Sequence, residues 1–166
     1  MKKFFVFLVL GIFLVLFQSS FLPRLFPLVL RPNLLLIVLV YLSMSGGSVW
    51  HTFWAACMGL FFDTLSGGPF GLFFFIFVAL YAILKGVNKL LLLKSPVFQA
   101  GAVLLAHFLQ GVLLITILVL LGLPFPGEPS YFGQLLVCSL IGAFLSPPFF
   151  GLFERIDCLP GLSGFD

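Results

Sequence analysis

The chain has 166 residues, of which 62% are hydrophobic and 8% are charged, and its mean hydropathy is +1.30. Water-soluble domains carry roughly 25% charged residues, so this composition excludes an ordinary soluble domain and indicates an integral membrane protein. The net charge of +3 does not indicate a nucleic-acid-binding protein, because the cations stand at the ends of apolar runs and form no dense patch.

Six apolar runs, separated by proline, glycine and charged residues, predict six transmembrane helices in one domain over residues 1–157. The fold class is therefore an all-α integral membrane protein. A tail over residues 158–166 contains Gly, Pro and Ser without periodicity, and we expect it to be disordered. The predicted helices cover Phe4–Leu22, Asn33–Ser45, Val49–Leu65, Pro69–Leu84, Val97–Leu121 and Tyr131–Phe153.

The first apolar run follows Lys2 and Lys3, as the core of a secretory signal does. It is longer than the roughly 7–15 residues of a signal core, and no small-residue cleavage site follows it, so we expect a retained helix. The second and third runs are short for a bilayer core that takes about 20 residues. Pro23, Pro27 and Pro32 predict that Leu22–Arg31 is a broken or interfacial segment between the first two helices.

The charged residues of the loops predict the orientation in the membrane. If the N-terminus is cytoplasmic, six cations lie on the inner side and two on the outer side. This bias places both termini in the cytoplasm and the loop Ser66–Gly71 at the outer face. The six inner cations are Lys2, Lys3, Lys85, Lys89, Lys94 and Arg155, and the two outer ones are Arg24 and Arg31.

Asp63 is the only acidic residue in the first 127 positions. A carboxylate at the bilayer centre costs about 2.5–3.5 kcal/mol on insertion scales, so an intramembrane acid is a candidate functional site. Backbone N–H groups of Ser66–Gly71 and of the start of the next helix can receive this carboxylate and fix the junction of the third and fourth helices. In that loop Gly67 and Gly68 allow unusual backbone angles, and Pro69 suits the first turn of the fourth helix.

Few other polar residues lie inside the apolar runs. His107 and Gln110 stand three residues apart, with Gln99 two turns upstream. They either line a cavity or partner surface, or make interhelical hydrogen bonds worth about 0.6 kcal/mol each, and we prefer the second interpretation. Small residues four apart favour close packing within the bundle over a particular dimer surface. These pairs are Ala55/Gly59, Ala102/Ala106, Ser139/Ala143 and Gly142/Ser146.

The sequence shows no pattern typical of catalysis, such as a nucleophile beside a base, paired carboxylates or a metal-binding cluster. The loop that begins at Ser66 lacks the Lys and the Ser or Thr of a phosphate-binding loop. We therefore predict that the protein is not an enzyme and has no catalytic, cofactor or metal site.

Three stretches of the chain resemble the rod shape-determining protein MreD family, and the length and six-span layout agree with it. The resemblance covers roughly residues 1–157. One departure is Asn33, where family members frequently carry Asp, although Asn caps a helix as well as Asp does. The stretches are Leu16–Ser20, Arg31–Leu36 and Gly59–Gly71.

The resemblance implies a non-enzymatic subunit of the cell-elongation machinery in the bacterial cytoplasmic membrane. Family members bind the membrane-anchored coiled-coil protein MreC, and through it act with MreB and the peptidoglycan glycosyltransferase–transpeptidase pair. Membrane lipid is a further expected partner, and nucleic acid is not expected to bind. A homo-oligomer within the complex is compatible with the resemblance. The candidate structural or partner-binding residues are Gln18, Pro32, Asn33, Asp63, Ser66, Gly67, Gly68, Pro69 and Gly71.

A second hypothesis comes from a wider resemblance. MreD-like proteins are regarded as similar to the substrate-binding subunits of energy-coupling-factor vitamin transporters. The alternative function is thus a small-molecule-binding transporter subunit with an outward-facing cavity near Asp63. Short outer loops and few intramembrane polar side chains favour the elongation subunit.

Overall fold

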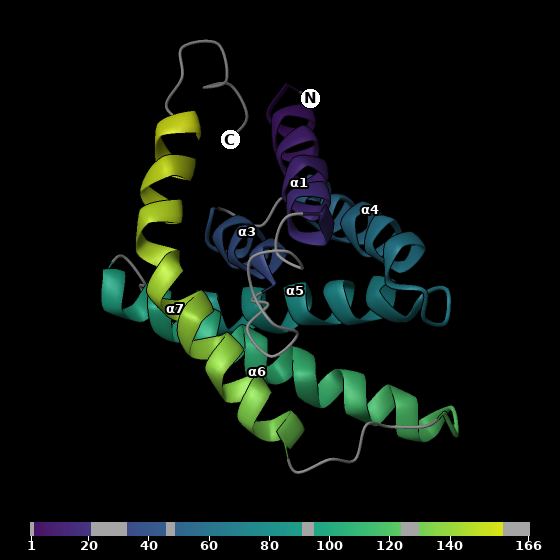
Figure 1. Ribbon diagram of the computed structural model, residues 1–166. Helices are drawn as coiled ribbons and strands as arrows, with labels where there is room; N and C mark the ends of the chain where they lie inside the picture. The colour runs from purple at the N-terminus through teal and green to yellow at the C-terminus, as the bar shows by residue number, and fades with distance from the viewer. Residues whose placement is uncertain (1, 21–32, 46–48, 91–94, 124–129, 158–166) are drawn as a thin grey trace.

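The computed structural model describes residues 2–20, 33–45, 49–90, 95–123 and 130–157 (Figure 1). Within these ranges every regular element is an α-helix, which confirms the predicted all-α fold. The expected break over residues 22–31 and the expected disorder of residues 158–166 fall outside the described residues. The helices are α1 (Lys2–Ser20), α3 (Leu34–Met44), α4 (Val49–Ser66), α5 (Leu72–Leu90), α6 (Pro96–Leu120) and α7 (Ser130–Asp157).

Helix α5 begins later than the sequence predicted, so the assignment of Pro69 to its first turn is wrong. The reason is Gly71, whose φ of +95° lies in the left-handed region and cannot belong to a right-handed helix. Pro69 lies in the turn before it, where its carbonyl accepts a hydrogen bond from Leu72 N–H at 3.2 Å. The helix therefore starts directly after the glycine.

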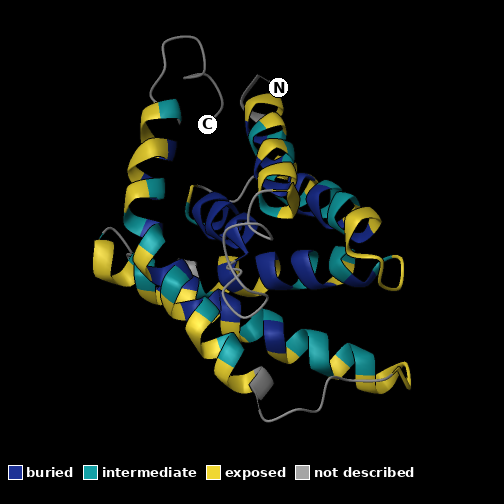
Figure 2. Cartoon of the chain, viewed as in Figure 1, coloured by how far each residue is buried: buried dark blue, intermediate teal, exposed yellow. Residues whose placement is uncertain are grey.

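Helix α3 forms the centre of the bundle. Every residue from Leu34 to Ser43 is buried, as Figure 2 shows by the dark colour all round this helix. A helix that is apolar on all sides has to be covered by other elements, and α3 packs against each of the other five described helices. With 11 residues at about 1.5 Å each, it is much shorter than a ~30 Å hydrocarbon core.

Two helical stretches are long and apolar enough to cross a membrane, Pro96–Leu120 and Phe132–Ile156. The stretches Phe5–Ser20, Leu34–Met44 and Leu72–Val87 are apolar but shorter. Together with the large apolar side chains exposed on the outer faces of α1, α6 and α7, these helices fit a protein associated with a membrane.

Helix α7 changes direction along its length (Figure 1), and Pro147 and Pro148 lie inside it. Proline removes a helical hydrogen bond and its ring crowds the preceding turn, which bends the helix. Beyond the prolines, the ring of Phe153 packs on Tyr41 of α3 with centroids 5.3 Å apart. Phe7 of α1 stacks on the same tyrosine at 5.9 Å, so aromatic side chains join the last turns of α7 to α1 and α3.

The predicted small-residue pairs lie at helix contacts, which confirms close packing within the bundle. All eight residues of the four pairs are buried. At the contact of α6 with α7, a Cβ atom added to Gly142 would lie 2.6 Å from Cε1 of His107. The imidazole ring therefore occupies the space that a side chain at position 142 would need.

Gly142→Ala is expected to lower the free energy of unfolding by about 1–3 kcal/mol, because an added methyl group overpacks the His107 contact. Thermal melting in detergent measures the effect. Gly151→Ala on the same helix is the matched control, since an added Cβ there meets no atom within 4 Å. Equal melting temperatures of the two variants would contradict the contact.

Candidate functional site

Asp63 lies near the C-terminal end of α4, is 3% exposed, and accepts three backbone hydrogen bonds from the start of α5. Oδ1 accepts from Phe73 N–H at 2.8 Å, and Oδ2 accepts from Gly71 N–H at 3.1 Å and Phe74 N–H at 3.2 Å. The first turn of a helix leaves these N–H groups without intrahelical acceptors, and its dipole favours an anion there. Asp63 is thus an N-terminal cap supplied by the preceding helix.

The sequence predicted donors for Asp63 in the segment Ser66–Gly71 and at the start of the next helix. Gly71 is such a donor. Phe73 and Phe74 lie beyond that segment, because the left-handed Gly71 ends the turn and puts the free N–H groups in the residues that follow it. The carboxylate therefore binds the helix start more than the glycine turn.

Gly59 brings α5 close enough for these bonds to form. A Cβ atom at this position would lie 2.6 Å from Cα of Phe74 and 2.8 Å from the carbonyl oxygen of Phe73. The backbone of α5 therefore rests directly on the backbone of α4. Because Gly59 and Asp63 are four residues apart, they share one helix face, and the close approach places the N–H groups over the carboxylate.

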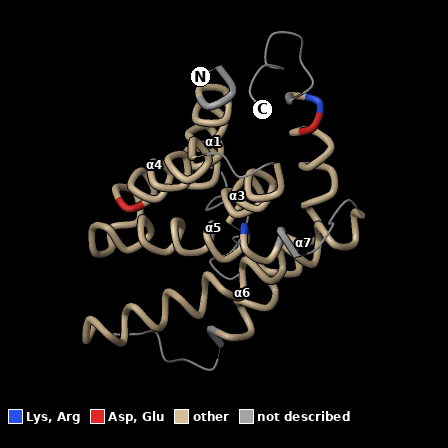
Figure 3. Tube along the Cα trace, turned by 180° about the vertical axis from the view of Figure 1, so that it is seen from behind, with Lys and Arg blue, Asp and Glu red and all other residues tan. Residues whose placement is uncertain are grey.

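Aromatic rings cover the helix contact beside the carboxylate. Phe62 and Phe73 meet edge to face with centroids 4.6 Å apart, and the ring of Phe77 lies 6.1 Å from that of Phe62. Figure 3 shows the acidic position of α4 at the α4–α5 corner, away from the charged end of α7. Hydrogen bonds strengthen in such a low-dielectric setting, so the three bonds to Asp63 are strong local restraints.

The turn between α4 and α5 is stabilised by its own short-range bonds. Gly67 has a φ of +66°, the left-handed conformation with which many helices end. Ser66 Oγ donates to the carbonyl of Asp63 at 3.2 Å and accepts from Gly68 N–H at 3.4 Å. The residues that resemble the family at this corner therefore form one hydrogen-bonded unit around Asp63.

A second polar site lies at the start of α3. Gln18, on α1, accepts a hydrogen bond from Leu34 N–H through Oε1 at 3.1 Å. This contact joins α1 to α3, and both of its residues are far from Asp63 in the sequence. The sequence placed Gln18 among the candidate residues only by its resemblance, because its acceptor role depends on how α1 packs beside α3.

Asn33 occupies the N-cap position of α3, but its side chain makes no capping bond, so the capping role expected for it is wrong. The usual partner, Leu36 N–H, is taken by the carbonyl of Asn33 at 3.1 Å. The side chain instead donates through Nδ2 to Oε1 of Gln110 on α6 at 3.4 Å. Pro32 lies outside the described residues.

The interhelical interpretation of the polar residues on α6 holds for Gln110 and is wrong for His107. Nδ1 of His107 bonds the carbonyl of Val103 on the same helix at 3.1 Å. The ring is buried against Gly142 and contacts α7 through packing. His107 therefore fills space between α6 and α7, whereas Gln110 joins α6 to α3.

The two sites can anchor helices through their hydrogen bonds. Both oxygens of Asp63 are engaged by backbone N–H groups. In the part of the chain that the structure describes, no three His, Cys, Asp or Glu side chains lie close enough to hold a metal ion.

Comparison with known proteins gives one match. A family model described as rod shape-determining protein MreD matches residues 1–156. This stretch includes both polar sites and every described residue except Asp157. Neither the curated proteins nor the solved structures give a match.

Asp63→Leu is expected to lower the free energy of unfolding by about 1–3 kcal/mol or more, because it leaves buried N–H groups without an acceptor. Asp63→Asn is expected to lower it less, since it keeps one oxygen but turns an NH₂ group towards a donor. Thermal melting in detergent measures both. Thr64→Ala, at the exposed neighbouring position, is the control and should melt like the unchanged chain. A melting temperature of Asp63→Leu equal to this control would exclude the cap as a source of stability.

Proposed function

The chain belongs to the MreD family of rod shape-determining membrane proteins, and from this we propose that it is a subunit of the bacterial cell-elongation machinery. It binds MreC in the cytoplasmic membrane and helps regulate cell shape and peptidoglycan synthesis. MreB and the peptidoglycan glycosyltransferase–transpeptidase pair are its indirect partners. The match of the family model over residues 1–156 is the observation that carries the proposal.

The geometry of the polar sites supports a scaffolding role without enzymatic activity. At the α4–α5 corner, Asp63 fixes the start of one helix on the end of another. At the start of α3, Gln18 and Asn33 join three helices. We propose that these restraints keep the helices in place as one domain over residues 1–157, so that a fixed surface is presented to the transmembrane segment of MreC.

The alternative function is a small-molecule-binding subunit of a vitamin-type transporter. Its main candidate residue was Asp63. An ionised carboxylate has about four acceptor positions, and backbone N–H groups of the protein occupy three of them. The carboxylate is therefore poorly placed to bind a ligand, which favours the elongation subunit.

We further propose six membrane spans with both termini in the cytoplasm. The excess of cations in the inner loops supports this orientation. In Figure 1 the first turn of α1 and the last turn of α7 lie at the same end of the molecule, and the α4–α5 corner lies away from them. Such an arrangement suits termini on one side of a membrane and the corner on the other.

Cysteine labelling tests the orientation. In a chain with Cys57, Cys138 and Cys158 replaced by alanine, a cysteine at Lys89 is expected to react with a membrane-impermeant maleimide only from the cytoplasmic side. A cysteine at Ser130 is expected to react only from outside, because the cation bias puts these loops on opposite sides. Reaction of both from one side would refute the six-span layout.

Copurification tests the partner. The tagged chain, extracted from native membranes, is expected to recover MreC. For Asp63→Asn, a structural role predicts that MreC recovery falls only in proportion to folded yield, and Thr64→Ala serves as the matched control. A well-folded Asp63→Asn that recovers no MreC would make Asp63 a contact residue. Failure of the unchanged chain to recover MreC would overturn the proposed function.

A further inference from the structure

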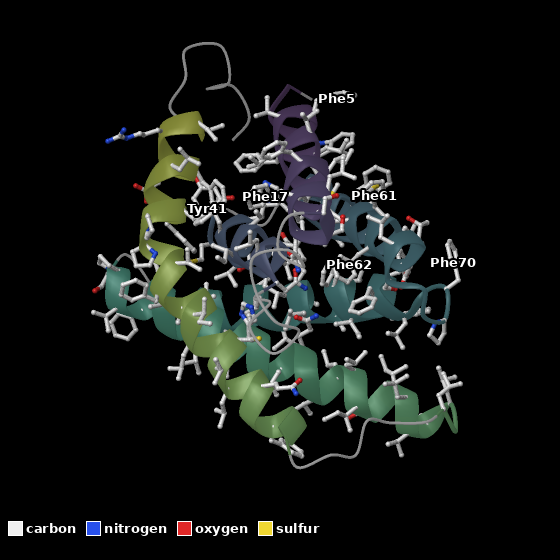
Figure 4. All side chains as sticks on the ribbon, in the orientation of Figure 1. Phe5, Phe17, Tyr41, Phe61, Phe62 and Phe70 are labelled. Atoms are coloured by element: carbon white, nitrogen blue, oxygen red, sulfur yellow. The ribbon has the colours of Figure 1, made fainter. Side chains whose placement is uncertain are left out.

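The α4–α5 corner exposes large apolar side chains as far as its tip. Phe70 is 74% exposed, Phe75 is 65% exposed and Leu65 is 46% exposed. Figure 4 shows Phe70 standing out from the turn, away from the helices. Asp63 is the one charged residue between positions 61 and 75, and it is buried. The exposed surface of the corner therefore carries no charge, and its large side chains are apolar.

Most polar groups of the same corner find their partners within it. Thr64 Oγ1 donates to the carbonyl of Phe61 at 2.7 Å, and Ser66 Oγ donates to the carbonyl of Asp63. Six backbone N–H groups around the turn are also accepted internally, Pro69 carries no N–H, and the N–H groups of Gly67 and Phe70 remain open to lipid headgroups or water. The N–H groups with acceptors are those of Gly68, Gly71, Leu72, Phe73, Phe74 and Phe75.

This combination suits lipid better than water. Acyl chains offer no hydrogen bonds, so backbone that enters them has to be satisfied internally, whereas a loop in water has no such need. A folded protein partner usually fixes its orientation through hydrogen bonds at the rim of a contact. Here the exposed hydroxyl groups of Thr64 and Ser66 already donate to the protein's own carbonyls.

Contacts within the protein also hold the tip of the corner in one conformation, without help from lipid or a partner. Gly71, the residue after Phe70, is fixed by its bond to Asp63. The ring of Phe75 lies beside the turn, 3.9 Å from the position that a Cβ on Gly71 would occupy. Little conformational freedom is lost when such a rigid apolar tip enters a membrane.

We propose that the α4–α5 corner is immersed in lipid at the boundary of acyl chains and headgroups of the outer leaflet, with Phe70 among the acyl chains. The inference rests on the membrane insertion in the proposed function. It adds how deep this corner lies in the membrane, which the distribution of cations between the loops does not determine. The corner is then a lipid-contacting surface and does not project into water.

Spin labelling of the full chain in liposomes that contain no other protein tests this depth. A label at Phe70→Cys, in the chain without native cysteines, is probed by oxygen, which concentrates in lipid, and by a water-soluble nickel chelate. The lipid reference is Phe144→Cys, 86% exposed in the span Phe132–Ile156, and the aqueous reference is the exposed Glu154→Cys. The oxygen-to-nickel accessibility ratio at position 70 should exceed that at position 154 several-fold and stay below that at position 144, which lies at the middle of its span.

A ratio at position 70 like that at position 154 would overturn the inference. Low accessibility to both probes would also overturn it, because the corner would then be covered by a second copy of the chain. Phe75→Cys is expected to behave like Phe70→Cys and keeps the test decisive if one variant does not fold. If the label at Phe144 itself reports water, the membrane insertion of the proposed function fails, which is distinct from a failure at the corner alone.

Discussion

The contact between the carboxylate of Asp63 and the first turn of α5 sets the position of that helix. Three N–H groups converge on one side chain, and Gly59 lets the two backbones touch beside them. Helix α5 in turn packs on the central α3, which contacts every other described helix. Apolar contacts between helices have little directional preference in a membrane, so one charged group supplies much of the orientation.

At the start of α3, a neutral side chain accepts the N–H group that the helix itself leaves without an acceptor. Gln18 of α1 accepts Leu34 N–H, as Asp63 of α4 accepts the N–H groups of α5. In both cases the acceptor belongs to the preceding described helix. Helix starts in water can be capped by solvent, but starts among apolar side chains need an acceptor from the protein itself. Both acceptors lie in stretches that resemble the MreD family.

Much of this arrangement could be predicted from the sequence, and the failures have identifiable causes. Long apolar runs gave the number and approximate bounds of the described helices, because hydropathy needs no knowledge of packing. Asp63 could be assigned to the next helix start, since no other acid stands near it. The side chain of Asn33 does not cap α3, because the carbonyl of Asn33 itself accepts the N–H group of Leu36. Pro69 lies outside α5, because Gly71 has a left-handed backbone conformation. The role of Gln18 depends on tertiary packing, which no local pattern contains.

The close helix contacts also constrain the order in which substitutions can accumulate. At position 142 the obstacle to a side chain is the ring of His107, so a smaller residue at position 107 is a permissive change that must come first. At Gly59 the obstacle is backbone of Phe73 and Phe74, which no substitution elsewhere removes. Positions 107 and 142 can therefore change together over evolutionary time. Position 59 remains glycine as long as the backbone of α5 packs directly on α4.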